Sequence, residues 1–136
     1  MLAHNLQPQL TEGRVNALVM LWLDSMRSQD KWDLTQEEVC TLLGCVSPKT
    51  YRSWISKARC DDEIALTIDV DTRLSLLTGI KKALAMSAPE GFEYDFFKRS
   101  INHPLFNGKS VKESIISNPS ILNLDAIRKY FDARRA

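Results

Sequence analysis

The sequence lacks the residues and runs that would indicate a metal site, a disulfide framework or a membrane span. It has three cysteines, Cys40, Cys45 and Cys60, and two histidines that lie far apart, and it contains no CxxC pair. This spacing does not supply the ligands of a tetrahedral zinc site. No apolar run approaches the roughly 18 residues that span a bilayer, and the N-terminus lacks the basic-then-apolar order of a signal peptide. We therefore expect a cytoplasmic protein without a metal, a cofactor or a membrane segment.

Strand patterns and the common catalytic motifs are missing as well. The only β-like run, residues 67–70, is too short to predict a strand. There is no glycine-rich phosphate loop and no HExxH motif. No nucleophile or carboxylate has an evident spacing to His103, which we interpret as a hydrogen-bonding residue of a loop. We therefore predict an all-α protein of about seven helices that is not an enzyme, has no catalytic residues and takes no small-molecule substrate.

Charge is balanced over the whole chain but uneven along it. The net charge is only +1, yet residues 61–72 contain five acidic side chains and no cation, whereas residues 100–136 contain six Lys or Arg against three acids. The acidic stretch has two interpretations: a linker between two basic lobes, or a set of helix caps. Asp69 and Asp71 directly precede an apolar helical pattern, which favours capping for those two.

The richest pattern covers residues 34–58 and predicts two short helices joined by a sharp turn at Gly44. Thr35 and Glu38 have the spacing of a capping box at the start of the first helix. Ser47 can cap the second helix and is followed by a proline, which is favoured at the first helical position. The second helix then has an apolar face with helical spacing, made by Tyr51, Trp54, Ile55 and Ala58. Cys40, on the first helix, is expected to be a core residue.

The remaining face of this second helix is cationic and polar, with no acidic residue between Ser47 and Ala58. Lysine and arginine suit phosphates, and hydroxyl groups suit base edges. The arrangement is typical of a helix-turn-helix whose second helix enters a DNA major groove. A purely structural αα-hairpin is the alternative interpretation. The candidate DNA-binding residues are Ser47, Lys49, Thr50, Arg52, Ser53 and Lys57.

Further helices are predicted before and after this hairpin. Helical patterns cover residues 11–28, 70–87, 92–101 and 124–134, and Ser110 with Glu113 forms a second capping box that opens a short helix. The apolar stripe of the first helix consists of Val15, Leu18, Val19, Trp22 and Met26.

The C-terminal half carries the segments RLSLLTGIKKAL, PLFNGKSVKES and DAIRKYFDA in that order. Together with the preceding hairpin, from about Thr11 to Ala136, they resemble the Xre/MbcA/ParS antitoxins, in which a toxin-binding domain follows an Xre-type helix-turn-helix. The family shows a Phe-x-Gly turn, a basic residue and then Ser or Thr at a helix start, matched here by Phe106, Gly108, Lys109 and Ser110. Two features depart from the family: Val111 stands where proline is usual, and the hairpin turn, Leu43-Gly44-Cys45-Val46-Ser47, is one residue longer than LGVS.

The resemblance implies the antitoxin of a type II toxin–antitoxin pair. It implies a helix-turn-helix domain over residues 1–62 and a small helical toxin-binding domain over residues 63–136. The usual partner of the family is a RES-domain toxin that consumes NAD, which the antitoxin inhibits by binding. The helix-turn-helix would repress the operon, so the expected partners are the toxin, operator DNA and a second copy of the chain.

The toxin-binding residues that we expect are Phe106, Gly108, Lys109, Arg128, Tyr130, Arg134 and Arg135. Tyrosine and arginine are enriched at binding hot spots, and a cationic tail suits a pocket for an anion. The alternative is a solvated helix end whose cations complement the helix dipole. Two other functions stay open: a stand-alone helix-turn-helix regulator whose C-terminal half dimerises or senses a ligand, and a helical adaptor that does not touch DNA.

Overall fold

The computed structural model describes residues 10–134, which contain seven α-helices and no β-strand. The helices are α1 (Glu12–Ser25), α2 (Gln36–Leu42), α3 (Pro48–Arg59), α4 (Ile68–Ser87), α5 (Glu93–Lys98), α6 (Val111–Ser117) and α7 (Ile121–Asp132). The prediction of an all-α protein is confirmed. None of these seven helices combines the length and the apolarity that crossing a membrane requires.

Side-chain caps define where several helices begin. Both predicted capping boxes are present: the Thr35 hydroxyl accepts the Glu38 N–H while the Glu38 carboxylate accepts the Thr35 N–H, and Ser110 and Glu113 form the same pair of bonds. Ser47 caps α3 as predicted. A cap needs a short polar side chain at one position of the helix start, so the sequence locates these three starts correctly.

Two helices begin earlier than their apolar patterns predict. Thr67 caps α4 and Ser120 caps α7, so that the helices start at residues 68 and 121 rather than at 70 and 124. Ile68 and Leu122, in these first turns, are 86% and 84% exposed. The residues that precede the predicted starts are not buried, so they leave no trace in the hydrophobic periodicity, and only the capping residue marks where each helix begins.

The buried face of α1 differs from the predicted stripe. Val15 and Leu18 are 42% and 41% exposed, while Met26 is buried as expected. The residues of α1 that are fully buried are instead Ala17, Met20 and Leu23. Apolar side chains surround most of this helix, and spacing alone therefore could not select the face that packs inward.

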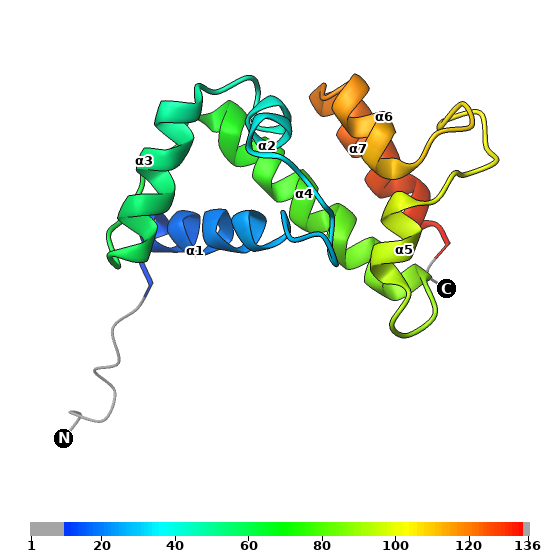
Figure 1. Ribbon diagram of the computed structural model, residues 1–136, viewed down its shortest axis with the longest axis horizontal. Coiled ribbons are helices and arrows are strands. Elements are labelled where there is room, and N and C mark those ends of the chain that lie inside the picture. The colour runs from blue at the N-terminus through cyan, green and yellow to red at the C-terminus, as the bar shows by residue number, and fades with distance from the viewer. Residues whose placement is uncertain (1–9, 135–136) are drawn as a thin grey trace.

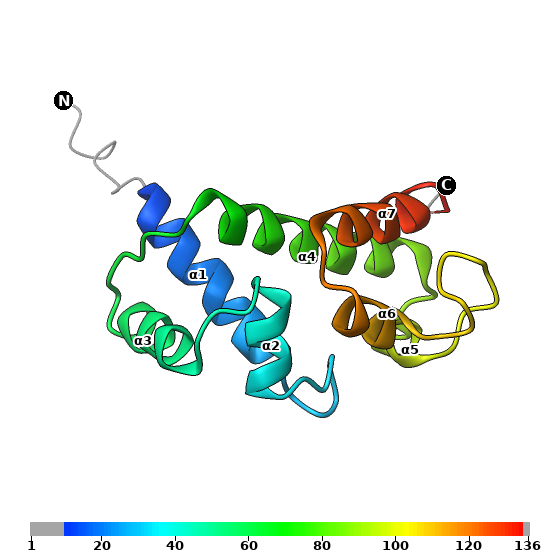
Figure 2. The same ribbon diagram turned by 90° about the horizontal axis from the view of Figure 1, so that it is seen from above.

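α4 runs along the molecule and joins its two ends (Figures 1 and 2). α1, α2 and α3 lie at one end, and α5, α6 and α7 gather toward the other. α7 lies parallel to α4, and two hydrogen bonds show this direction. Arg73 donates to the Pro119 carbonyl near the starts of both helices, and the Ser87 hydroxyl donates to the Phe131 carbonyl, at 3.0 Å, near their ends.

The loop between α1 and α2 contacts the C-terminal helices. Trp32 stacks on Phe97 of α5 with ring centroids 4.3 Å apart and planes inclined by 5°. Lys112 of α6 donates to the Asp33 carbonyl at 2.6 Å, and Lys98 donates to the carbonyl of residue 29. The predicted boundary between residues 1–62 and 63–136 falls in the connection before α4, and these contacts join the two sides of it.

Candidate nucleic-acid interface

The turn between α2 and α3 contains two consecutive residues in the left-handed region. Gly44 has φ = 95° and Cys45 has φ = 63°. The Val46 N–H then returns to the Cys40 carbonyl at 3.2 Å. Cys40 is buried and Cys45 is exposed, which confirms the core position expected for Cys40. The outcome is a tight turn between α2 and α3, with α3 capped directly after it.

α3 packs on the protein through the predicted apolar face. Tyr51, Ile55 and Ala58 are buried, and Trp54 is half-buried. This face contacts α1 and α2. Because the helix has its apolar residues on one side only, its opposite side is free to face a partner.

All six candidate DNA-binding residues are exposed: Ser47, Lys49, Thr50, Arg52, Ser53 and Lys57. The Ser47 hydroxyl is engaged in the cap, where it accepts the Thr50 N–H at 3.0 Å. The three cations are different, since within residues 10–134 the side chains of Lys49, Arg52 and Lys57 make no hydrogen bond or ion pair. These three side chains therefore present positive charge to solvent without a direct acidic partner.

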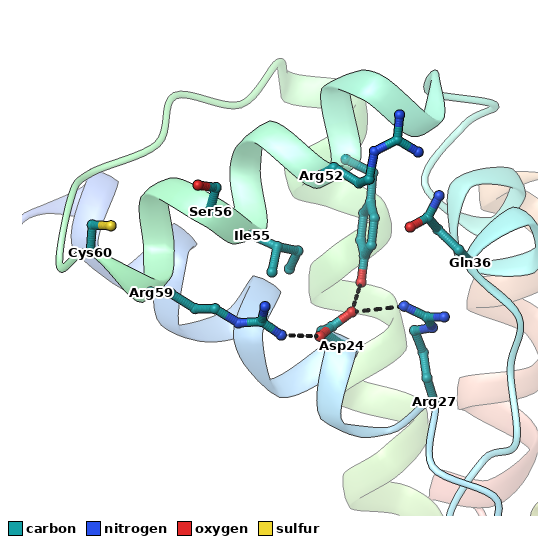
Figure 3. A pocket seen from close by; sticks show the side chains of 9 residues that line it. Asp24, Arg27, Gln36, Arg52, Ile55, Ser56, Arg59 and Cys60 are labelled. Atoms are coloured by element: carbon teal, nitrogen blue, oxygen red, sulfur yellow. Dashed lines mark hydrogen bonds and ion pairs between the residues drawn. The ribbon is translucent and has the colours of Figure 1, made fainter.

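One flank of α3 borders a cavity of about 400 Å³ between α1, α2 and α3 (Figure 3). Arg52, Ser56 and Arg59 line it from α3, at the spacing i, i+4, i+7 that puts side chains on one side of a helix. Asp24 and Arg27 contribute from the end of α1, and Gln36 contributes from the start of α2. The cavity thus contains three guanidinium groups and one carboxylate.

Asp24 is the centre of this cluster. Its Oδ1 accepts the Tyr51 hydroxyl at 2.6 Å and Nη1 of Arg27 at 3.2 Å, while its Oδ2 accepts Nη2 of Arg59 at 3.2 Å. Burial, with the hydrogen bond to Asp24 as the next cause, raises the pKa of Tyr51 far above its usual value. The Tyr51 hydroxyl therefore stays a donor, and Asp24 stays the acceptor that connects α1 to α3.

Asp24, Arg27, Gln36 and Arg59 are cavity residues that reasoning from the sequence did not identify. Arg59 had a local signal, because it continues the cationic flank seven residues after Arg52. Asp24 and Arg27 had none, since they belong to a helix whose packing on α3 follows from tertiary structure. Asp24 and Arg59 are 35 residues apart in the chain.

The candidate toxin-binding residues lie in two different environments. Phe106 is 1% exposed and packs its ring on Tyr130, with centroids 5.0 Å apart. Phe106 is thus a core residue that supports Tyr130 rather than a surface that a partner can touch. Gly108 and Lys109 are exposed in the turn that follows, where Gly108 has φ = 80°.

The α7 candidates line the surface near the C-terminal end. Arg134 lies over the Tyr130 ring, 3.7 Å from its centroid, and both residues border a cavity of about 380 Å³. Arg128 is tied to its own helix by ion pairs with Asp125 at 2.9 Å and Asp132 at 3.9 Å. Arg135 lies outside the described residues. The structure therefore brings Tyr130 and Arg134 together, whereas Arg128 pairs within its own helix and Lys109 lies in a separate turn.

Over residues 10–134, no three His, Cys, Asp or Glu side chains are placed to hold a metal ion. His103 accepts the Leu105 N–H with its Nδ1 at 3.1 Å, which confirms its interpretation as a loop hydrogen-bonding residue. The exposed cationic face of α3 is the strongest candidate site. A comparison with protein-family models, with curated proteins and with solved structures finds no match for the chain.

Proposed function

We propose that this protein is an antitoxin that represses its own operon by binding DNA through α3 and neutralises a toxin through its C-terminal half. The observation that carries the DNA part is the exposed face of α3, with its unpaired cations Lys49, Arg52 and Lys57 and no acidic residue. The major groove is about 12 Å wide and admits a helix. In such a docking, the lysines and arginines would contact phosphates and base edges.

The toxin part rests on the resemblance to the Xre/MbcA/ParS antitoxins and on the chemistry of the C-terminal surface. The half-buried Tyr130 and the exposed Arg134 form an aromatic–cation pair beside a cavity, and these residue types recur at protein interface hot spots. The proposed partner is a RES-domain toxin that consumes NAD. The proposal includes a cytoplasmic location and a homodimer, since a palindromic operator would match a two-fold symmetric protein.

A mobility shift on the protein's own promoter tests the DNA part. We expect the full chain to shift this fragment and the double variant Lys49→Ala/Arg52→Ala to bind it much more weakly. Lys82→Ala is the matched control, because Lys82 is an exposed cation of α4 at the other end of the molecule. An unchanged shift with the double variant would remove α3 from the interface.

Co-expression with the neighbouring gene tests the toxin part. We expect that gene to arrest growth alone, and this chain to co-purify with its product and restore growth. Arg134→Glu should weaken the rescue while Lys82→Glu should not, since only Arg134 borders the proposed surface. Harmless expression of the neighbour without this chain would contradict the antitoxin assignment.

A stand-alone regulator is the second candidate function. The observation that favours it is the cavity lined by Ser87, Phe96 and Tyr130, together with the Trp32–Phe97 stack that connects the C-terminal helices to the loop before α2. A ligand bound in that cavity would change the position of α2 and α3 through the Trp32–Phe97 contact. Operator binding that responds to a small molecule, in a cell with no toxin gene nearby, would select this function over the first.

A further inference from the structure

We propose that the cavity between α1, α2 and α3 binds one phosphate group through Arg27, Arg52 and Arg59, and that the DNA backbone supplies this phosphate. The choice of DNA as the source rests on the proposed function, whereas the affinity for phosphate rests on the cavity alone. The proposal adds α1 to the DNA contacts, because Arg27 belongs to the turn that ends this helix.

The charges around the cavity favour an anion. Three guanidinium groups border it and Asp24 is its single carboxylate. Figure 3 shows Arg27 and Gln36 on one side of Asp24 and Arg59 on the other. A phosphate at this cavity would be approached by planar guanidinium donors from both sides of Asp24, and each guanidinium can offer two parallel N–H groups, the arrangement that suits phosphate oxygens.

Enough donors remain after the internal bonds are made. Each guanidinium has five N–H donors. Arg59 directs Nη2 to Asp24, and Arg27 directs Nη1 to Asp24 and Nε to the Leu34 carbonyl. In the described part of the chain, Arg52 makes no hydrogen bond or ion pair, and the Gln36 amide makes no hydrogen bond. Each of these side chains thus has at least one donor available for a phosphate oxygen.

Asp24 acts as a positioning residue in this site. By accepting one bond from Arg27 and one from Arg59, it holds two cations from different helices at the same cavity. Its negative charge also lowers the affinity for an isolated anion. A duplex overcomes this, because it delivers its phosphate while other contacts along α3 hold it in place.

The cavity lies where a duplex would run if α3 entered a groove. Arg52, Ser56 and Arg59 form the flank of α3 next to the exposed face that contains Lys49 and Ser53. A helix in the major groove has a phosphate backbone along each flank. A free phosphate ion is the other source of the same chemistry, and the experiment below separates the two.

The test is fluorescence anisotropy of promoter DNA at several KCl concentrations, with full-length protein. We compare wild type with Arg27→Gln and Arg59→Gln, and use Lys82→Gln as the control for loss of one exposed positive charge. Losing one phosphate contact should reduce the slope of log K against log[salt] by about 0.9 and weaken binding roughly tenfold, as for one charge-assisted hydrogen bond. The control should change neither quantity. If wild type binds and both arginine variants keep its slope, DNA does not supply a phosphate to this cavity.

A second arm uses inorganic phosphate and follows the arginine Nε–H and Gln36 amide signals by NMR. Saturable shifts that Arg59→Gln abolishes would show a phosphate site even if wild type binds no DNA, in which case the proposed function fails and the free ion is the source. Unchanged spectra together with unchanged salt slopes would overturn the proposal. Arg27→Lys, which keeps the charge without the planar fork, guards against misfolding of Arg27→Gln, and its thermal unfolding would be measured alongside.

Discussion

The Tyr51 hydroxyl donates a 2.6 Å hydrogen bond to Oδ1 of Asp24, and this bond ties the buried face of α3 to the end of α1. The same carboxylate accepts Arg27 and Arg59. A single carboxylate therefore orients α3 and gathers the cations beside it, so that the stability of the hairpin and the placement of its charges depend on the same residue.

Tyr51→Phe should lower the free energy of unfolding by about 1–2 kcal/mol, because it removes a donor to a partly buried carboxylate. Urea unfolding measures the change. Tyr94→Phe is the matched control, since the Tyr94 hydroxyl has no hydrogen-bond partner among the described residues, and it should change stability little. Equal losses for both variants would contradict the role of the Asp24 bond.

Alkaline pH should destabilise the protein through Tyr51. Burial in the folded state raises the pKa of Tyr51 above its usual value of about 10, so the unfolded chain releases this proton first as the pH rises. Stability is therefore intact below pH 10 and is lost progressively above it. Urea unfolding between pH 8 and 11 should show a steeper decline for wild type than for Tyr51→Phe. If both proteins lose stability equally between pH 8 and 11, a group other than Tyr51 causes the loss of stability at alkaline pH.

Gly44→Ala should destabilise the hairpin turn by more than about 1 kcal/mol, because a left-handed φ is costly for an L-residue and the new Cβ would lie 2.8 Å from Oδ2 of Asp69. Gly91→Ala separates these two causes, since Gly91 has φ = 86° but a Cβ there would meet nothing within 4 Å. Thermal unfolding should rank Gly44→Ala as the more harmful change. If Gly91→Ala were the more harmful change, contact between a Cβ at Gly44 and the Asp69 side chain of α4 would not be a cause of the destabilisation.

Ser110→Ala should cost about 1 kcal/mol of stability, the typical value for loss of an N-cap. The backbone N–H of Ser110 and, second, its hydroxyl hold the pKa of Glu113 below its usual value; the substitution removes only the hydroxyl, so this pKa should rise part of the way toward its usual value. NMR titration of the Glu113 carboxyl checks the second effect. Ser75→Ala, at an exposed position of α4, is the control and should leave both quantities unchanged. The stabilisation that Glu113 provides is present at neutral pH and lost as the pH falls through its folded pKa.

The Trp32–Phe97 stack should couple the two ends of the molecule by about 1 kcal/mol beyond its burial, as aromatic pairs do. A double-mutant cycle with Trp32→Leu and Phe97→Leu measures this energy by denaturant unfolding. Phe97→Leu combined with Tyr51→Phe gives the comparison, and these two changes should be additive because the side chains share no partner. If the two changes in the first cycle were additive, the stack would contribute no interaction free energy between the two ends of the molecule.

The sequence patterns predicted the cationic face of α3 and the starts of the helices that have side-chain caps. They placed Thr35, Ser47 and Ser110 correctly because a cap acts within three residues of the chain. The predicted stripe of α1 was wrong at Val15 and Leu18, which are exposed, and the predicted starts of α4 and α7 were late because the residues before them are not buried. Hydrophobic periodicity predicts the buried face of an amphipathic helix well, but it cannot predict the buried face of a helix that is apolar on most sides.

The sequence by itself determined an all-α chain, a capped hairpin and an acid-free helix α3, because capping, turn geometry and helical spacing all act between near neighbours. Only the tertiary structure decided that Phe106 is core, that Trp32 lies on Phe97, and that Asp24 meets Tyr51 and Arg59. Those last two contacts join residues 27 and 35 positions apart. They depend on which face of α1 packs inward, and that choice is made by the fit of whole helices rather than by any local pattern.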